Sequence, residues 1–183
     1  TLLVDQLRPT DTVSIVVYGD RARMVLPPRS VSEENRTTIL GAIDSLETEG
    51  ATNAEGGLRM AYESAWSEFN TQAINRVILV SDGVANIGNT GAGSIWEQIE
   101  QYAERDITLT TVGIGMGNYN DVLMEQLADG GNGTYAYVDT IEEAQRIFVD
   151  ELTGTLQTIA YDTKIQVEFN EETVRSYRLL GYE

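Results

Sequence analysis

Asp82 is the first residue whose type and position could do chemistry. It directly follows an apolar run, Val77 to Val80, and Ser81, and it precedes Gly83. Such a run indicates a buried parallel strand that ends in a loop. In open α/β sheets, ligands bind at the carboxyl ends of the strands, and a carboxylate there suits a hard cation such as Mg²⁺. Asp82 is therefore a candidate metal ligand, and its alternative role is that of a turn residue before Gly83.

A second polar loop precedes a predicted helix. The segment Gly50-Ala51-Thr52-Asn53 places Thr52 thirty residues before Asp82. The helix is indicated by apolar residues at helical spacing, namely Leu58, Ala61, Tyr62, Ala65 and Phe69. Thr52 or Asn53 can cap this helix.

These two loops, in this order and spacing, resemble the second and third metal-site loops of the von Willebrand factor A domain family. The resemblance extends from about residue 1 to about residue 153, and the flanking segments at 2–9, 135–137 and 177–183 are similar to a bacterial extracytoplasmic subgroup. It implies a metal-ion-dependent adhesion site. Thr52 would be a direct hydroxyl ligand of Mg²⁺, Mn²⁺ or Ca²⁺, and Asp82 would bind directly or through water. An Asp or Glu side chain of a partner protein would fill the open position, and Asn53, Gly83 and Asn86 would contact that partner.

The family's first metal-site loop, Asp-x-Ser-x-Ser, does not occur in this sequence. We therefore expect metal binding by this fragment to be weak or absent, and we expect the missing loop to lie upstream of residue 1. The resemblance also implies a central first strand between the strands at 12–18 and 76–81. An upstream segment, a strand from a second copy in a strand-exchanged dimer, or the segment 163–169 would fill that position, and we favour the upstream segment.

Composition excludes several classes of function. The chain has no Cys and no His, so it holds no disulfide, no thiol nucleophile and no Ser-His-Asp triad. Its net charge of −17 disfavours nucleic acid and anionic membranes as partners. No apolar stretch approaches the roughly 20 residues of a membrane span. Gly113-Ile-Gly-Met-Gly117 lacks the full dinucleotide fingerprint and is better interpreted as a tight turn.

Strands alternating with helices predict a doubly wound α/β domain. We expect strands at 12–18, 76–81, 107–112 and 134–138 in a mostly parallel sheet with helices on both faces, and an antiparallel edge hairpin in which 21–26 returns after Gly19-Asp20. Ser32 is expected to cap the helix that follows it, and Ser94 and Thr140 open capping boxes. The alternation at Ile165, Val167 and Phe169 predicts a half-exposed strand. We expect two domains. Residues 1–158 would form an N-terminally truncated domain that resembles the von Willebrand factor A domain, and residues 159–183 would be the start of a β-rich C-terminal extension.

The function that these observations favour is a non-enzymatic, extracytoplasmic protein-interaction module, periplasmic or at the cell surface and possibly anchored in a membrane upstream. It would bind a partner carboxylate through a divalent cation. A metal-free structural A domain is the first alternative, and a nucleotide- or phosphoryl-handling α/β enzyme is the second.

Overall fold

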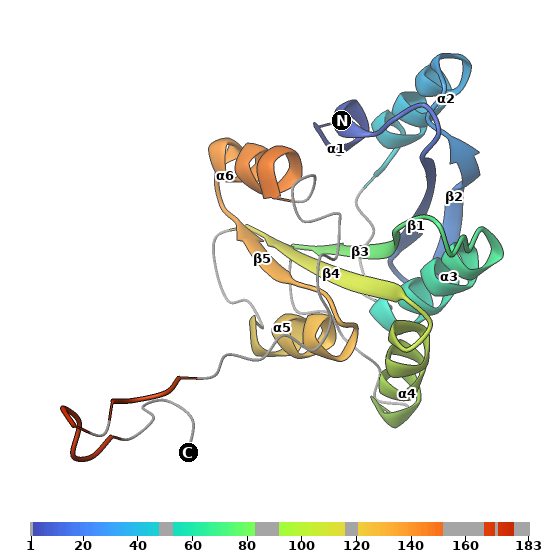
Figure 1. Ribbon diagram of the computed structural model, residues 1–183. Helices are drawn as coiled ribbons and strands as arrows, with labels where there is room; N and C mark the ends of the chain where they lie inside the picture. The colour runs from blue at the N-terminus through green and yellow to red at the C-terminus, as the bar shows by residue number, and fades with distance from the viewer. Residues whose placement is uncertain are drawn as a thin grey trace.

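The computed structural model describes residues 2–47, 53–82, 92–115, 121–151, 167–170 and 172–177. A short helix and a strand hairpin come first, two helices follow, and strands and helices then alternate up to the last two helices (Figure 1). The helices are α1 (Leu2–Gln6), α2 (Glu33–Asp44), α3 (Ala54–Ser67), α4 (Ala92–Ala103), α5 (Asp121–Gly130), α6 (Ile141–Gln145) and the π-helical η1 (Arg146–Glu151). The strands are β1 (Thr12–Tyr18), β2 (Ala22–Ser30), β3 (Asn75–Ser81), β4 (Ile107–Ile114) and β5 (Tyr135–Val138).

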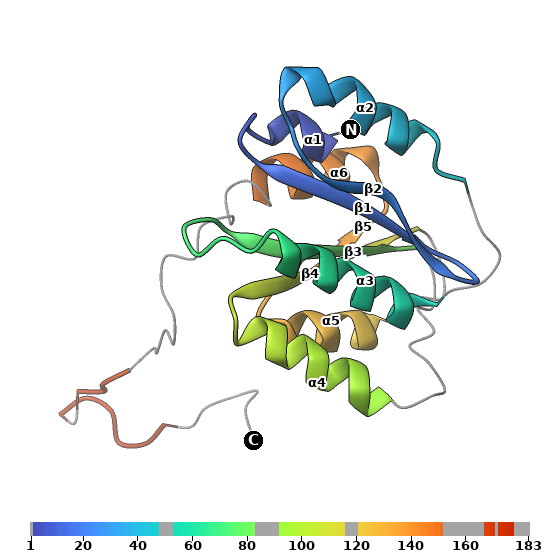
Figure 2. The ribbon, with the colours of Figure 1, turned by 90° about the vertical axis from the view of Figure 1, so that its right-hand side faces the viewer.

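The strands form two sheets between two layers of helices. One sheet is the antiparallel hairpin β1–β2, and the other is parallel with the order β3-β4-β5. Figure 2 shows α3, α4 and α5 on one face and α1, α2 and α6 on the other. This confirms the predicted α/β class, with its mostly parallel sheet, its helices on both faces and its antiparallel hairpin.

Three apolar clusters hold the layers together. The largest lies between the parallel sheet and α3, α4 and α5, and its fully buried members include Leu58, Tyr62, Ile99, Leu109 and Leu127. A second cluster packs the hairpin against α1 and α2, and a third packs β4 and β5 against η1. Leu58 and Tyr62, two of the apolar residues at helical spacing, are thus core residues, as that spacing predicted.

Some local boundaries differ from the sequence-based expectation. β2 begins at Ala22 and continues through Pro27 and Pro28 to Ser30, because register shifts opposite Ile15 place the extra residues in bulges. Helix α4 begins at Ala92, so Ser94 lies inside its first turn and not at the expected N-cap position.

Of the caps predicted at Ser32 and Thr140, only the second makes the expected side-chain hydrogen bond. Ser32 occupies the N-cap of α2 but makes no side-chain cap hydrogen bond. The side chain of Thr140 does accept a hydrogen bond from the backbone N–H of Glu143, which confirms that cap.

The C-terminal segment forms a local turn. The side chain of Asn170 accepts a hydrogen bond from the N–H of Glu172, and the rings of Phe169 and Tyr177 stack at 4.2 Å between centroids. Residues 167–170 belong to no strand, so the described part of the predicted strand at 165–169 is not formed. Among the described residues, no helix is long and apolar enough to cross a membrane.

The hairpin and the parallel sheet are not joined by strand pairing. β1 pairs with β2 on one edge, β3 pairs with β4 on one edge, and within the described residues no strand pairs with their other edges. Across this interval, the hydroxyl of Tyr18 donates a hydrogen bond to the carbonyl oxygen of Val80 at 2.8 Å. The expectation that a further strand fills the interval stays a prediction.

Tyr62 offers a stability test in the main core. Its ring stacks on that of Tyr102 at 4.7 Å between centroids, but its buried hydroxyl has no hydrogen-bond partner among the described residues. An unsatisfied buried polar group costs about 1–3 kcal/mol, so we expect Tyr62→Phe to raise the free energy of unfolding by about 1 kcal/mol near neutral pH. Urea denaturation measures this change, and a destabilised variant would contradict it.

The same variant should alter the alkaline pH dependence. Burial raises the pKa of Tyr62 above the usual value of 10.0. The unfolded chain therefore loses this proton at a lower pH than the folded protein does. The contribution of Tyr62 to the free energy of unfolding is fully present below pH 10 and is lost as the pH rises above it. We expect Tyr62→Phe to reduce that fall. The control Tyr177→Phe removes a hydroxyl from a side chain that is 72% exposed and should change neither quantity.

Candidate functional site

Asp82 lies where β3 ends, as its position after an apolar run predicted. Ser81 is the last, buried residue of the strand, and Asp82 is exposed directly after it. Ser81 pairs with Gly113 of β4, so the carboxyl ends of the two strands lie side by side. The carboxylate of Asp82 is thus presented to solvent at the edge where α/β sheets bind ligands.

The segment that follows β4 lies beside this edge of the sheet. Gly115 has a φ of +117° and its N–H donates to the carbonyl oxygen of Val138 at the end of β5. The hydroxyl of Tyr137 donates to the carbonyl oxygen of Gly115. A Cβ at Gly115 would lie 3.8 Å from the backbone oxygen of Asp82, so this segment runs close to the candidate ligand. Of the Gly-rich segment, Gly113 and Ile114 are the last residues of β4 and Gly115 bends away from the strand. Met116 and Gly117 lie outside the described residues, so the tight turn stays a prediction.

The loop before α3 reaches the same region through Asn53. The side chain of Asn53 accepts a hydrogen bond from the N–H of Gly56 at 3.0 Å, so Asn53 is the N-cap of α3. Its own N–H donates to the carbonyl oxygen of Gly19 at 2.8 Å. Figure 2 shows the tip of the β1–β2 hairpin beside the start of α3. Thr52, Gly83 and Asn86 lie outside the described residues.

Tyr18 is the side chain that the sequence did not single out. It ends β1, contacts the start of α3 and bonds to Val80 of β3. Burial raises the pKa of Tyr18; a hydrogen bond with Ser81 opposes this effect, and the negative charge of Asp82 adds to it. A signal for this contact was present in Gly56-Gly57, because glycine early in a helix often marks a close approach by another chain segment.

The donor chemistry fits a hard divalent cation. Asp82 supplies a carboxylate, which is a hard oxygen ligand, and the chain has no His or Cys that would favour a softer metal. Within the part of the chain that the structure describes, no group of three or more acidic residues could hold a metal ion.

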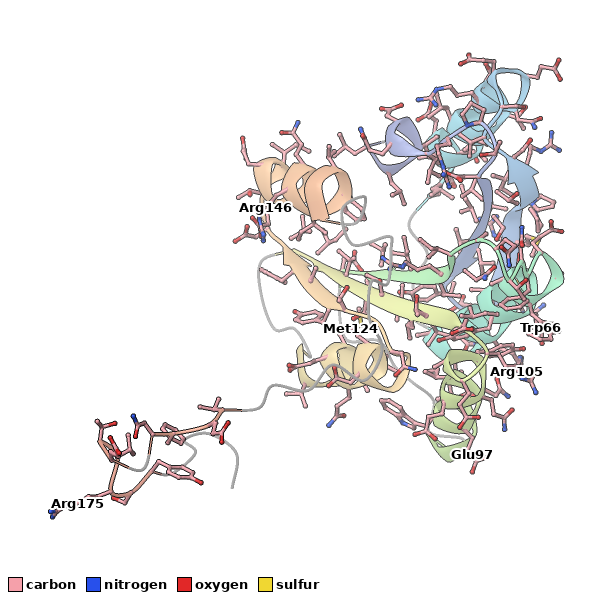
Figure 3. All side chains as sticks on the ribbon, in the orientation of Figure 1. Trp66, Glu97, Arg105, Met124, Arg146 and Arg175 are labelled. Atoms are coloured by element: carbon pink, nitrogen blue, oxygen red, sulfur yellow. The ribbon has the colours of Figure 1, made fainter. Side chains whose placement is uncertain are left out.

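Trp66 marks the other conspicuous surface. Its side chain is 44% exposed and stacks on Phe69 at 5.3 Å between ring centroids, and the guanidinium of Arg105 lies 5.1 Å from its ring centroid. Figure 3 shows Trp66 and Arg105 close together near the carboxyl ends of α3 and α4. Because these helix ends lie at the opposite edge of the sheet from Asp82, this cluster belongs to packing between α3 and α4 and not to the candidate site.

Comparison with known proteins agrees with this geometry. Residues 1–151 match the von Willebrand factor type A domain, and residues 154–183 match the C-terminal region described as "Uncharacterized protein YfbK, C-terminal". The chain is 43% identical over 182 residues to "Uncharacterized protein YfbK" of Escherichia coli (strain K12), an alignment that covers 100% of this chain and 31% of that protein. The chain thus spans about a third of this curated relative.

Solved structures share the fold at lower sequence identity. A von Willebrand factor type A protein from Catenulispora acidiphila has a TM-score of 0.69 at 20% identity, covering 83% of this chain and 35% of that one. BatB from Bacteroides thetaiotaomicron has a TM-score of 0.64 at 20% identity, covering 83% and 82%. Proximal thread matrix protein 1 from the mussel byssus, with a zinc-occupied metal-ion-dependent adhesion motif, has a TM-score of 0.59 at 20% identity, covering 84% and 38%.

The elements flanking Asp82, the order of the two loops and the match over residues 1–151 all lead to one assignment. The chain belongs to the von Willebrand factor type A domain family.

Proposed function

We propose that this domain is a protein-interaction module that binds an acidic side chain of a partner through a divalent cation at the carboxyl edge of its parallel sheet. The observation that carries the proposal is the exposed carboxylate of Asp82 at the end of β3, beside the capped start of α3. Von Willebrand factor type A domains are commonly protein-interaction modules, and the chemistry of this edge supports the same role.

Asp82 would hold the cation, with Thr52 as the second ligand. Mg²⁺ is the proposed ion, and Mn²⁺ or Ca²⁺ are substitutes with the same preference for oxygen ligands. When bound, the ion would supply a positive charge that attracts a carboxylate. Asp82 neutralises only half of a divalent charge, so a partner's Asp or Glu remains strongly attracted. Asn53, Gly83 and Asn86 would contact that partner around the ion.

The charge of the whole chain also selects the partner. With a net charge of −17, the domain repels other anions at long range, so an acidic partner residue can bind only where a cation offsets that repulsion. This makes cation dependence a strong requirement for this partner class. It also disfavours nucleic acid, whose affinity for proteins comes mainly from basic side chains.

The proposed location is extracytoplasmic. A structural relative from Bacteroides fragilis, with a TM-score of 0.58 at 19% identity, is an aerotolerance-related membrane protein. The description of that relative as a membrane protein supports our proposal that this domain lies at the outer side of a bacterial membrane.

The test is isothermal titration calorimetry, in which Mg²⁺ and Mn²⁺ are added to the full-length wild-type protein and to its Asp82→Ala variant. We expect Asp82→Ala to weaken binding by tenfold or more, because it removes the charged ligand. Its free energy of unfolding should stay within about 0.5 kcal/mol of the wild type, since Asp82 is exposed. The control Glu104→Ala removes one exposed negative charge after α4, at the opposite edge of the sheet, and should leave binding unchanged.

Two results would contradict the proposal. One is a wild type that binds neither ion, in which case the domain is a metal-free structural module. The other is equal loss of binding in Asp82→Ala and Glu104→Ala, which would mean that the ion is attracted by the overall charge and not held at the site.

A further inference from the structure

We propose that Tyr18 and Gly19, at the tip of the β1–β2 hairpin, are positioning residues that hold the two loops of the cation site at a fixed separation. This inference rests on the proposed function and adds to it. Neither residue supplies a ligand. One contacts the strand that leads to Asp82, and the other contacts the residue that follows Thr52.

The contact with the Asp82 loop is a hydrogen bond. The hydroxyl of Tyr18 donates to the carbonyl oxygen of Val80 at 2.8 Å, two residues before Asp82. β1 and β3 are not paired strands, so this bond links the end of the hairpin to the end of the parallel sheet. The position of the carboxyl end of β3 relative to the hairpin therefore depends on the tyrosine side chain.

The contact with the other loop is made by the next residue along the chain. The carbonyl oxygen of the buried Gly19 accepts a hydrogen bond from the N–H of Asn53 at 2.8 Å. Asn53 is itself fixed as the N-cap of α3 by its bond to Gly56. The residue that directly follows Thr52 is thus held both by the helix and by the hairpin.

Gly57 completes the arrangement by allowing α3 to lie against Tyr18. A Cβ at position 57 would come within 2.9 Å of the Cβ of Tyr18 and 3.0 Å of its ring. Only glycine permits this approach without a shift of the helix or the ring. The ring of Tyr18 is therefore fixed between the first turn of α3 and the end of β3, and its hydroxyl sets the spacing between them.

Fixed spacing matters most for Mg²⁺. This ion requires near-octahedral oxygen ligands at about 2.0–2.1 Å, whereas Ca²⁺ accepts six to eight ligands at about 2.3–2.6 Å in flexible arrangements. Loosening the two loops should therefore weaken Mg²⁺ binding more than Ca²⁺ binding. A general loss of stability would not change the ratio of the two affinities.

The experiment compares the full-length Tyr18→Phe variant, which lacks only the hydroxyl, with the full-length wild type. Hydrogen exchange followed by mass spectrometry should show faster exchange in the segments around Asn53 and Val80, with no change in β4. Calorimetric titrations of MgCl₂ and CaCl₂ should show that the affinity for Mg²⁺ falls by about tenfold and that the affinity for Ca²⁺ falls less. Tenfold is the lower end of the effect of removing a residue that orients metal ligands.

Tyr137→Phe is the matched control. It also removes a tyrosine hydroxyl that donates to a backbone carbonyl at this edge, but that carbonyl belongs to Gly115. Exchange around Asn53 should be the same in Tyr137→Phe and in the wild type.

The outcomes separate this inference from the proposed function. Unchanged exchange around both Asn53 and Val80 in Tyr18→Phe would overturn the positioning role, whether or not the wild type binds a cation. Faster exchange at both segments would support it even if the wild type bound neither ion, a result that would overturn the proposed function alone. Equal losses of Mg²⁺ and Ca²⁺ affinity would overturn the role of Tyr18 in ion selection.

Discussion

Gly133→Ala is expected to destabilise the domain by about 3 kcal/mol or more, a large part of the 5–15 kcal/mol that usually stabilises a domain. A Cβ at position 133 would lie 1.9 Å from the carbonyl oxygen of Leu109 and 2.5 Å from its carbonyl carbon. Over-packing of a core commonly costs about 1–3 kcal/mol, because side chains can move aside. Here the obstacle is the backbone of β4, the central strand of the parallel sheet, which cannot move without breaking its pairing.

The position of Gly133 follows from the way the turn after α5 meets β4. The N–H of Leu109 donates to the carbonyl oxygen of Gly131 at 2.9 Å, and the N–H of Thr111 donates to that of Thr134 at 2.9 Å. Gly133 lies between these two bonds, so the turn and the strand are held together on both sides of it. A larger residue would have to break one of these bonds.

Thermal and urea denaturation measure the effect, and Gly41→Ala is the control. Gly41 lies inside α2, and a Cβ there would meet nothing within 4 Å. Alanine in a helix interior is favoured over glycine by about 0.5–1 kcal/mol, so this substitution should stabilise the domain. A Gly133→Ala variant as stable as the wild type would show that the turn can move away from β4.

Local sequence signals predicted the elements well where the cause is local. The strands at β1, β3 and β4 follow from short apolar runs, and the caps at Asn53 and Thr140 follow from residue type. The exposure of Asp82 follows from its place after a buried strand, because a parallel strand must end in a loop that returns over the sheet.

The features that sequence reasoning missed depend on contacts between distant residues. The bond from Tyr18 to Val80 joins residues 62 apart, and Gly19 was interpreted only as a turn residue. The bulges at Pro27 and Pro28 depend on how β2 pairs with β1, so the strand was expected to stop at Leu26. The predicted start of α4 at Ser94 was wrong because a capping pattern can occur inside a helix as well as at its end.

The interval between β1 and β3 carries the other large expected effect. None of the seven residues of β1 is buried, although Val13, Ile15 and Val16 are apolar, and Val80 of β3 is 41% exposed. The bond between Tyr18 and Val80 places the carboxyl ends of β1 and β3 at the same edge, so the two strands run in the same direction. A strand parallel to both would pair with their open edges and cover these side chains.

We expect a strand in this interval to raise the free energy of unfolding by about 3 kcal/mol or more. Fully burying one valine or isoleucine side chain contributes about 1.5–3 kcal/mol, and the strand would complete the burial of several. The test links a seven-residue strand of valine and threonine through a flexible linker ahead of residue 1, and measures urea denaturation against the unlinked chain 1–183. Light scattering distinguishes a filled monomer from a strand-exchanged dimer.

The control carries two prolines in the middle of the same added strand. Proline lacks the N–H that pairing requires, so this variant should fall back toward the stability of the unlinked chain. Equal stabilisation by the proline-containing strand would mean that the added residues act by covering apolar surface without pairing. No stabilisation by either strand would mean that the interval is closed, with Tyr18 and the packing of α3 holding the hairpin against the parallel sheet.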